Sequence, residues 1–411
     1  LGVRQAAHQS SAPFGKRGGA CHDGGVCALL RPFTGYVPAP SFADRLAGPP
    51  ASTLTPRQID VARNDALSFR YSLGRGAGSS HGEAVEWLEK GRTRGALQPV
   101  GPAVFVYRQS DENVSATGLI ADVSLRAYDS GLVEKHEKTI TRTEGKMADY
   151  MRTTRVYGNP VALGHRPEAH ISAAVAARTG RDPDSMFATV DGITHELWAI
   201  KGDEAQALCR DFNSVLYITD GHHRLAAASR VASEEGRTEA CLPAGLFSAD
   251  ELRLRSFARC VVDSEINTDA VVTRLGAEHH MVEVSPAEAR PLARGEFGLG
   301  IGNRHFRLRL GTDEVPDDPY ESLDVNLLQK LILEPVFGVT ESRGHRRLHF
   351  VADLTDSSHL DLDADAWFLP FPAAVEDVMA VADSGRVMPP KSTLFTPKLP
   401  AGLVVRLIDE G

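Results

Sequence analysis

Apolar and polar positions change their spacing abruptly near residue 220, and this change predicts a strand followed by a helix. The run Val215–Ile218 is apolar and β-prone, as in a buried strand. Beyond it, apolar residues recur at helical spacing between Leu225 and Ala232, up to Gly236. Asp220 stands where an N-cap residue is expected. The sequence therefore predicts a sharp strand-to-helix turn at residues 220–224 (Asp-Gly-His-His-Arg).

Strand-like and helix-like patterns alternate through most of the chain. The apolar runs 103–107 and 117–125 flank a polar stretch, 109–115, which predicts an antiparallel hairpin. Further strands are expected at 160–163, 195–200, 256–262, 305–310, 348–352 and 403–408, and helices at 143–155, 169–178, 267–275, 326–337 and 374–384. This pattern predicts an α/β (α+β) fold with a mixed sheet.

Composition narrows the class of protein. The 411 residues are 42% hydrophobic and 24% charged, typical of a globular protein long enough for two domains. No run approaches the roughly 18 apolar residues of a membrane span. The net charge of −9 argues against nucleic acid as the main partner, since phosphate-backbone binding needs a concentrated basic surface. Five scattered cysteines favour a reducing, cytoplasmic setting. Residues 1–29 are expected to form a disordered extension.

Two imidazoles and a guanidinium stand on the first turn of the predicted helix, at His222, His223 and Arg224. The first N–H groups of a helix have no partners and carry a partial positive charge, so such an end attracts anions. A phosphate group fits this site. The alternative is that Asp220 and Gly221 serve only the turn and the histidines are solvated.

Two further stretches carry candidate chemistry. His136 and Glu137, with Thr139 nearby, lie in a loop between a strand and a helix, where a carboxylate is able to accept a proton from a hydroxyl group. The alternative for this loop is a solvated charged turn. His195, on a predicted strand near Trp198, is either a core or a site residue.

The second stretch lies near the C-terminus and combines two lysines with hydroxyl groups. Lys391, Ser392, Thr393 and Lys398 follow Pro389-Pro390 in a proline-restrained loop that suits an anion, although a purely structural loop is the alternative. No Gly-x4-Gly-Lys-Ser/Thr motif occurs, which excludes a P-loop. Gly298–Gly302 leads into a strand, so it predicts a hairpin rather than a dinucleotide-binding turn.

Five segments, in order, resemble the Domain of Unknown Function 1015 (DUF1015) family. They are Lys135–Thr139, Gly192–Trp198, Asp220–Arg224, Leu323–Val325 leading into Ile332–Pro335, and Val387–Lys398. That family resembles the ParB/sulfiredoxin superfamily and, within it, the free serine kinases, and the likeness runs from about Leu30 to the C-terminus. Family members tend to carry Tyr-Asp after a Pro-Pro pair, where this chain has Ala51-Ser52. They also often carry Thr-His-Arg, where this chain has Phe257-Ala258-Arg259, so only the arginine is retained.

The resemblance implies a ParB/sulfiredoxin-like nucleotide-binding core at 30–244 and a C-terminal α/β portion at 245–411 that contributes the basic loop. It implies a kinase that phosphorylates the hydroxyl group of a free, serine-like amino acid with ATP or ADP and Mg²⁺. The implied catalytic residues are Glu137 as general base, Asp220, His222 and His223, with Asp220 also on the metal. The implied nucleotide-binding residues are Gly221, His222, His223, Arg224, Lys391, Ser392, Thr393 and Lys398, and His136 and Thr139 would contact the amino acid. The alternative function is a nucleotide-binding regulator or DNA-associated switch of the ParB type.

Overall fold

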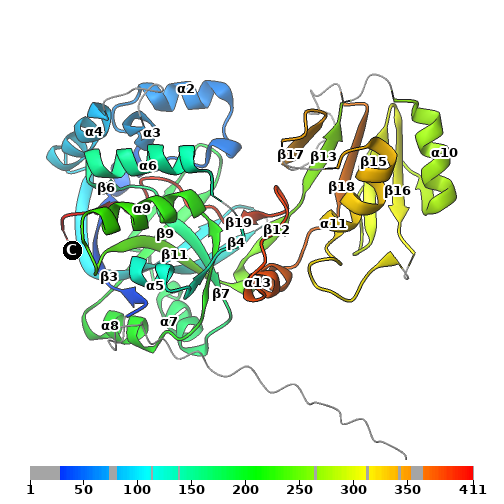
Figure 1. Ribbon diagram of the computed structural model, residues 1–411. Helices are drawn as coiled ribbons and strands as arrows, with labels where there is room; N and C mark the ends of the chain where they lie inside the picture. Colours follow the sequence, from blue (N-terminus) through cyan, green and yellow to red (C-terminus); the bar gives the residue numbers. More distant parts are fainter. Residues whose placement is uncertain are drawn as a thin grey trace, which may run out of the picture.

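The computed structural model describes residues 28–73, 81–112, 114–137, 139–262, 266–311, 314–340, 344–352 and 364–410. The extension expected at residues 1–29 lies outside these ranges except for Ala28 and Leu29. The described chain forms two bodies, each built on one large sheet, with β12, β19 and α13 between them (Figure 1).

A ten-stranded mixed sheet forms the larger body, which confirms the predicted α/β class. The strands in spatial order are β5 (Val133–Glu134), β10 (Leu216–Asp220), β7 (Val161–His165), β11 (Cys241–Ser248), β4 (Ser115–Ser124), β3 (Leu97–Ser110), β9 (Thr194–Lys201) and β8 (Ser185–Ala188), with β1 (Leu30–Arg31) on β4 and β2 (Phe33–Pro38) on β3. The pairs β10–β5 and β11–β7 are parallel and the others antiparallel. The predicted hairpin is the antiparallel pair β3–β4.

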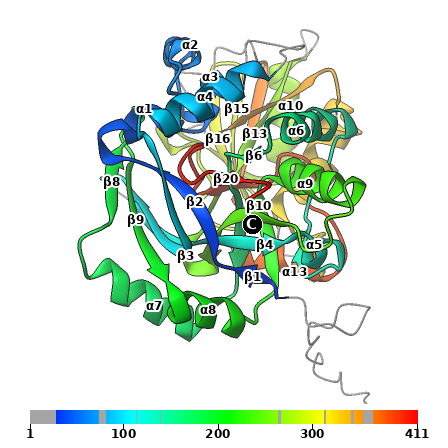
Figure 2. The ribbon, with the colours of Figure 1, turned by 90° about the vertical axis from the view of Figure 1, so that its left-hand side faces the viewer.

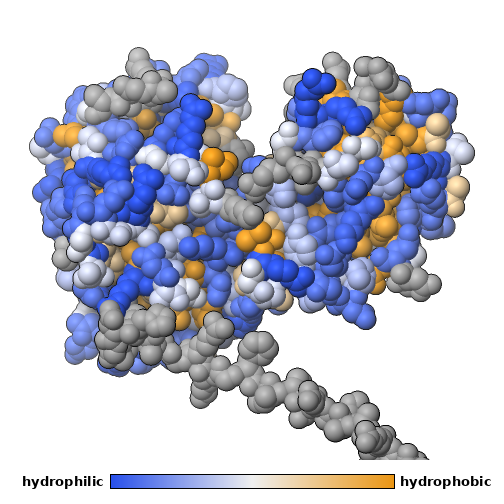
Figure 3. Space-filling model, viewed as in Figure 1, coloured by the Kyte–Doolittle hydropathy of each residue, from blue (hydrophilic) through white to orange (hydrophobic). Residues whose placement is uncertain are grey.

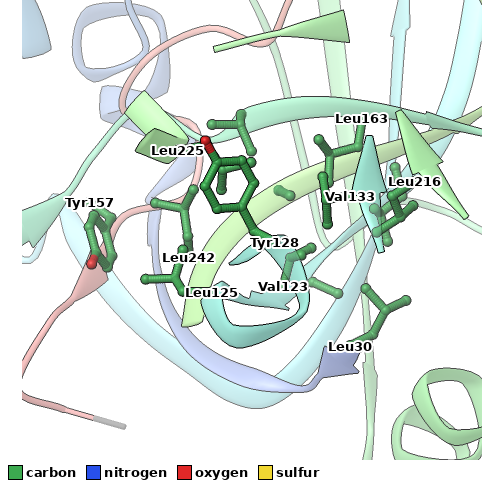
Figure 4. Close-up of a cluster of buried hydrophobic side chains, with 14 of the residues drawn as sticks. Leu30, Val123, Leu125, Tyr128, Val133, Tyr157, Leu163, Leu216, Leu225 and Leu242 are labelled. Atoms are coloured by element: carbon green, nitrogen blue, oxygen red, sulfur yellow. The ribbon is translucent and has the colours of Figure 1, made fainter. Parts of the chain in front are cut away.

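Helices from the middle of the sequence cover one face of this sheet. They are α5 (Leu125–Asp129), α6 (Thr141–Thr154), α7 (Ala169–Thr179), α8 (Gly202–Asp211) and α9 (His222–Glu234). Their apolar sides join those of the strands in one buried cluster. Figure 4 shows part of this cluster, including Leu163 and Leu216 of the sheet and Leu225 of α9. Burial at helical spacing between Leu225 and Ala232 confirms the apolar face expected for α9.

The opposite face of the sheet is covered largely by the C-terminal part of the chain. Helix α13 (Val375–Asp383) and the apolar side chains of Met388, Phe395 and Val404 pack there against β3, β10 and β11. The N-terminal helices α1 (Ala43–Leu46), α3 (Phe69–Ser72) and α4 (Gly82–Thr93) supply residues to this face or to a separate small core around Trp87. Helix α2 (Pro56–Asn64), which precedes α3, has no buried residue.

An antiparallel six-stranded sheet forms the smaller body. Its order is β14 (His280–Glu283), β16 (Arg304–Arg309), β15 (Glu296–Ile301), β18 (Ala366–Pro370), β13 (Phe257–Val261) and β17 (Leu348–Ala352). Its associated helices are α10 (Thr268–Glu278), α11 (Asp324–Leu328) and α12 (Glu334–Phe337). The continuous helix expected at 326–337 is instead interrupted by a π-helical segment, Gln329–Leu333. The hairpin expected at Gly298–Gly302 is confirmed, since Gly302 turns β15 into β16.

After the smaller body, the chain returns to the larger one through two short ribbons. β19 (Leu394–Thr396) pairs with β12 (Arg253–Arg255), and β20 (Arg406–Leu407) pairs with β6 (Val156–Tyr157). Figure 2 shows β20 beside β2, where Val405 also bridges to Tyr36. The strand expected at 403–408 is thus only two residues long. β11 runs through residue 244, the expected end of the first domain, and the described chain beyond it contributes to both bodies.

The space-filling view shows a hollow between the two bodies and a mostly hydrophilic surface with small hydrophobic patches (Figure 3). Among the described residues, no helix is both long and apolar enough to cross a membrane.

A buried ion pair anchors the returning C-terminal segment. Arg406 of β20 donates from Nε to Oδ2 of Asp122 on β4 at 2.6 Å, and the two side chains are 9% and 4% exposed. Burial raises the pKa of Asp122 to about 6, even though Arg406 opposes that rise. The environment thus disfavours an unpaired carboxylate at this position.

We expect Arg406→Met to lower the free energy of unfolding by about 3–5 kcal/mol, because it leaves Asp122 buried without its partner. Urea unfolding followed by circular dichroism measures this change. The matched control is Arg45→Met, which breaks the 2.8 Å pair with Asp65 at a more exposed position and should cost no more than about 1 kcal/mol. Equal losses in the two variants would show that the buried pair has no special weight.

Candidate functional site

The turn from β10 to α9 depends on Gly221. Its φ of 103° lies in the left-handed region, which a residue without a Cβ adopts at little cost. A Cβ there would lie 2.7 Å from Val161 Cγ1 and 3.0 Å from Arg224 Nη2. Gly221, not Asp220, is the N-cap of α9, and no described side chain caps this helix end. The cap assigned to Asp220 was therefore wrong, and the first N–H groups of α9 face the site without a side-chain acceptor.

Asp220 and Arg224 form an ion pair across the first turn of α9. Arg224 also donates from Nη1 to the carbonyl of Pro160 and to Oδ1 of Asn159, each at 2.6 Å. These contacts engage the guanidinium with the loop before β7. Arg224 therefore holds the turn in place and directs Asp220, whose side chain is 39% exposed.

His222 and His136 meet in a buried pair beneath the turn. Their rings lie edge to face with centroids 4.6 Å apart. Burial lowers the pKa of His222 to about 4 and that of His136 to about 3, with a smaller effect of His222 on His136. Both imidazoles are therefore neutral near pH 7. Nδ1 of His222 lies 4.0 Å from Oε2 of Glu137, so the predicted base and the predicted anion site come together.

His223 is held by a backbone N–H group just before α6. The N–H of Ile140, the residue before that helix, donates to His223 Nε2 at 2.9 Å. Since Nε2 accepts this bond, the proton of a neutral His223 is on Nδ1.

Thr219 is a site residue that the sequence pattern did not reveal. The register of β10 on β7 shifts between Ile218 and Asp220, which places Thr219 in a bulge. Bulges redirect side chains and occur often beside active sites. The Thr219 Oγ1 and the His222 Nε2 are buried atoms without a hydrogen-bond partner in the described structure. Because buried polar groups are normally paired, these two atoms point to a ligand that would complete them.

A cavity of about 270 Å³ lies over the turn, and we call it the first cavity. It joins four parts of the chain that are far apart in the sequence. Its lining residues are His136, Glu137, Met147, Thr219, Asp220, Gly221, His222, His223, Arg224, Phe257, Met388, Pro389, Lys391, Thr393, Leu394, Phe395 and Lys398. The C-terminal loop reaches the turn because Met388 N–H donates to the His136 carbonyl at 2.8 Å and Phe395 packs on the His136 ring.

Two predicted site residues do not line this cavity. Thr139 is exposed, with its Oγ1 3.5 Å from Oε2 of Glu144. Ser392 is buried and donates to the Pro389 carbonyl at 2.7 Å, so it shapes the loop.

Arg259, the retained family arginine, is buried on β13 and donates to the Phe257 carbonyl at 2.6 Å. Phe257 itself lines the cavity and was not predicted.

Two lysines, Lys391 and Lys398, line the first cavity. Neither Lys391 nor Lys398 forms an ion pair with a residue that the structure describes. Lys391 adopts a φ of 54°, and its ammonium lies 5.3 Å from the centre of the Phe257 ring. A non-glycine residue in this region is strained, and such strain clusters at functional sites. With the end of α9, the two lysines make an environment suited to a phosphate group.

Asp220 and Glu137 are the carboxylates that line the first cavity. Within the described ranges, no group of three or more His, Cys, Asp or Glu side chains is arranged to hold a metal ion. Mg²⁺ in phosphate-binding sites is commonly held by one or two carboxylates together with the phosphates. The exposed part of Asp220 fits that mode of binding.

The geometry defines an α/β protein whose first cavity brings lysine side chains to the start of a helix, and the comparisons with known proteins give its family. The sequence matches the family described as "Protein of unknown function (DUF1015)" over residues 30–326, so the chain belongs to that family. No match was found among curated proteins.

Three solved structures have weak overall similarity to this chain. Free serine kinase in complex with AMP has a TM-score of 0.36 and 17% identity over 70% of this chain and 91% of that chain. A conserved hypothetical protein from Pyrococcus furiosus gives 0.34 and 17% over 71% and 97%. The third, SbnI with a C-terminal truncation from Staphylococcus aureus, gives 0.36 and 11% over 68% and 87%.

We expect Gly221→Ala to destabilise the protein by about 2 kcal/mol, because a Cβ at this φ is strained and crowds Val161 and Arg224. Thermal unfolding measures the loss. The matched control is Gly180→Ala, at a residue with φ of −78° whose added Cβ would meet only the Ala176 carbonyl, at 3.7 Å. That change should be neutral or slightly stabilising. If both variants unfold at the wild-type temperature, the turn does not require glycine.

Proposed function

We propose that this protein is a phosphotransferase that binds ATP or ADP and phosphorylates the hydroxyl group of a small, serine-like amino acid. The observation that carries the proposal is the first cavity, where the start of α9, His222 Nε2 and two lysines converge. Among the described residues, that Nε2 has no hydrogen-bond partner and the two lysines have no ion-pair partner. Phosphoryl transfer is catalysed mainly by positioning and charge stabilisation, and these groups supply both. A TM-score of 0.36 is too low to transfer a function from free serine kinase, so the proposal depends on the cavity.

Each residue of the cavity has a distinct role in this proposal. The N–H groups at the start of α9, the imidazoles of His222 and His223, and the ammonium groups of Lys391 and Lys398 hold the phosphates. Mg²⁺, bound by Asp220 and the phosphates, would neutralise charge on the nucleotide. Thr393 and the bulged Thr219 offer hydroxyl groups toward the same space.

Glu137 is the proposed general base. Its carboxylate is 44% exposed at the mouth of the buried histidine pair, where an incoming hydroxyl group is able to reach it. The hydroxyl oxygen forms a bond to the terminal phosphorus as the bond to the nucleotide's bridging oxygen breaks. The hydroxyl proton passes to Glu137, and the shortened nucleotide leaves with the bridging oxygen.

The proposal also covers the domain boundaries that the resemblance to the DUF1015 family implies, and a role for His136. We infer a ParB/sulfiredoxin-like core at residues 30–244, completed by a C-terminal portion at 245–411 whose loop reaches the site. His136 would then act by supporting His222 and the C-terminal loop, since its ring is buried between His222 and Phe395.

The test is calorimetric titration of ADP, ATP and CTP, with Mg²⁺, into the full chain, followed by phosphorus NMR with L-serine and other hydroxyl amino acids. We expect one of the adenine nucleotides to bind, and His223→Ala and Lys391→Ala each to weaken that binding about 10- to 100-fold through loss of a phosphate contact. We expect Glu137→Gln to retain nucleotide binding while slowing transfer about 10²- to 10⁴-fold.

Lys201→Ala provides the matched control, since Lys201 is an exposed lysine outside the cavity lining, and it should bind like wild type. If nucleotide affinity is the same in all variants, the phosphates do not bind at the turn. A nucleotide that binds there without any phosphomonoester product would instead favour a regulator of the ParB type.

A further inference from the structure

A second cavity, of about 340 Å³, adjoins the first. Leu394 and Lys398 line both cavities, so a ligand in one would lie directly beside a ligand in the other. The second cavity is formed by the tips of the β3–β4 and β8–β9 hairpins, the Pro49-Pro50 loop, β12 and the segment after β19. None of these hairpin residues belongs to the phosphate-binding turn.

Asp191 is a carboxylate that lines this cavity. The Thr53 hydroxyl donates to its Oδ2 at 2.8 Å and the Thr189 hydroxyl to its Oδ1 at 2.6 Å. Among the described residues, no Lys, Arg or His lies within ion-pair distance of it. Two neutral hydroxyl groups thus orient a negative charge toward the cavity, and the remaining lone pairs are able to accept from a cation.

The buried His195 supports this arrangement. Its side chain is 3% exposed, and its Nε2 lies 3.0 Å from the Thr189 hydroxyl oxygen. Burial lowers the pKa of His195 to about 4, so the ring is neutral near pH 7. A neutral imidazole holds Thr189 in place without cancelling the charge of Asp191, which leaves that charge available to a ligand.

Positively charged side chains also line the second cavity. Among the described residues, the Arg253 guanidinium donates only to the carbonyls of Asp250 and Leu252. Lys398 forms no ion pair within the described part of the chain. Glu251, a further carboxylate there, accepts the Thr117 N–H at 2.8 Å. The cavity therefore contains separate unpaired charges of both signs, which suits a small molecule carrying one charge of each sign.

We propose that the second cavity binds the acceptor amino acid as a zwitterion, with Asp191 receiving its ammonium group and Arg253 its carboxylate. The assignment of this amino acid as the phosphoryl acceptor rests on the kinase function proposed above. Binding in this cavity places the amino-acid hydroxyl beside the first cavity, because Lys398 borders both. Asp191 and Arg253 are binding residues here and take no part in the proton transfer.

The test uses the full chain and saturation-transfer NMR with four probes: L-serine, L-threonine, 3-hydroxypropionate, which lacks the ammonium group, and ethanolamine, which lacks the carboxylate. We expect L-serine or L-threonine to bind wild type more tightly than either analogue. Asp191→Asn should weaken amino-acid binding about 10- to 100-fold and leave 3-hydroxypropionate unchanged. Arg253→Met should weaken amino-acid binding and leave ethanolamine unchanged, which provides a second variant if Asp191→Asn folds poorly.

Asp203→Asn is the matched control, because Asp203 is an exposed carboxylate on α8 that lines neither cavity. It should match wild type with every probe. The affinity for ADP should be the same in wild type, Asp191→Asn and Arg253→Met. Failure of both amino acids to bind wild type, or binding unaffected by Asp191→Asn and Arg253→Met, would overturn the inference.

The two proposals fail separately. If phosphoryl transfer occurs but its KM for the amino acid is unchanged in Asp191→Asn, the second cavity is not the acceptor site while the kinase function stands. If an amino acid binds through Asp191 but no phosphomonoester forms, the kinase function fails while the second cavity stands as an amino-acid site.

Discussion

The return of the C-terminal segment to the ten-stranded sheet is the constraint on which the candidate site depends. The chain leaves that sheet after β11, forms the six-stranded sheet and comes back through β19, β20 and the buried pair of Arg406 with Asp122. This return covers an apolar sheet face that would otherwise be exposed to water. It also delivers Lys391 and Lys398 to the end of α9. Burial of the core and assembly of the site are thus consequences of one packing arrangement.

Neutral and charged side chains have different roles within the site. His136 and His222 lie too deep to carry a positive charge near pH 7, so they contribute hydrogen bonds and packing rather than charge. The lysines carry the charge at the cavity wall, where water still reaches them. Arg224, although it lines the cavity, is occupied with Asn159, Pro160 and Asp220. The turn is therefore rigid before a ligand arrives, which lowers the cost of binding a phosphate.

Local patterns predicted much of this structure, because they report local constraints. The strand, glycine turn and helix around Gly221 were evident from apolar spacing, and three separate motifs do meet at one cavity. What could not be predicted depends on tertiary contacts. Asp220 pairs with Arg224 instead of capping the helix, Ser392 faces the Pro389 carbonyl, and the Thr219 bulge depends on pairing with β7. Asp191 carried no local signal, since its isolation from cations results from how hairpins and the C-terminal segment pack.

The most direct test of the central claim is a crystal structure of the full chain with ADP and Mg²⁺. We predict that the terminal phosphate lies within hydrogen-bonding distance of the first N–H groups of α9, of a nitrogen of His222 or His223, and of the Lys391 ammonium. A nucleotide bound at the turn would establish the first cavity as the phosphate site of this DUF1015 protein. A nucleotide bound elsewhere, with the turn unchanged and its buried atoms filled only by water, would contradict the account.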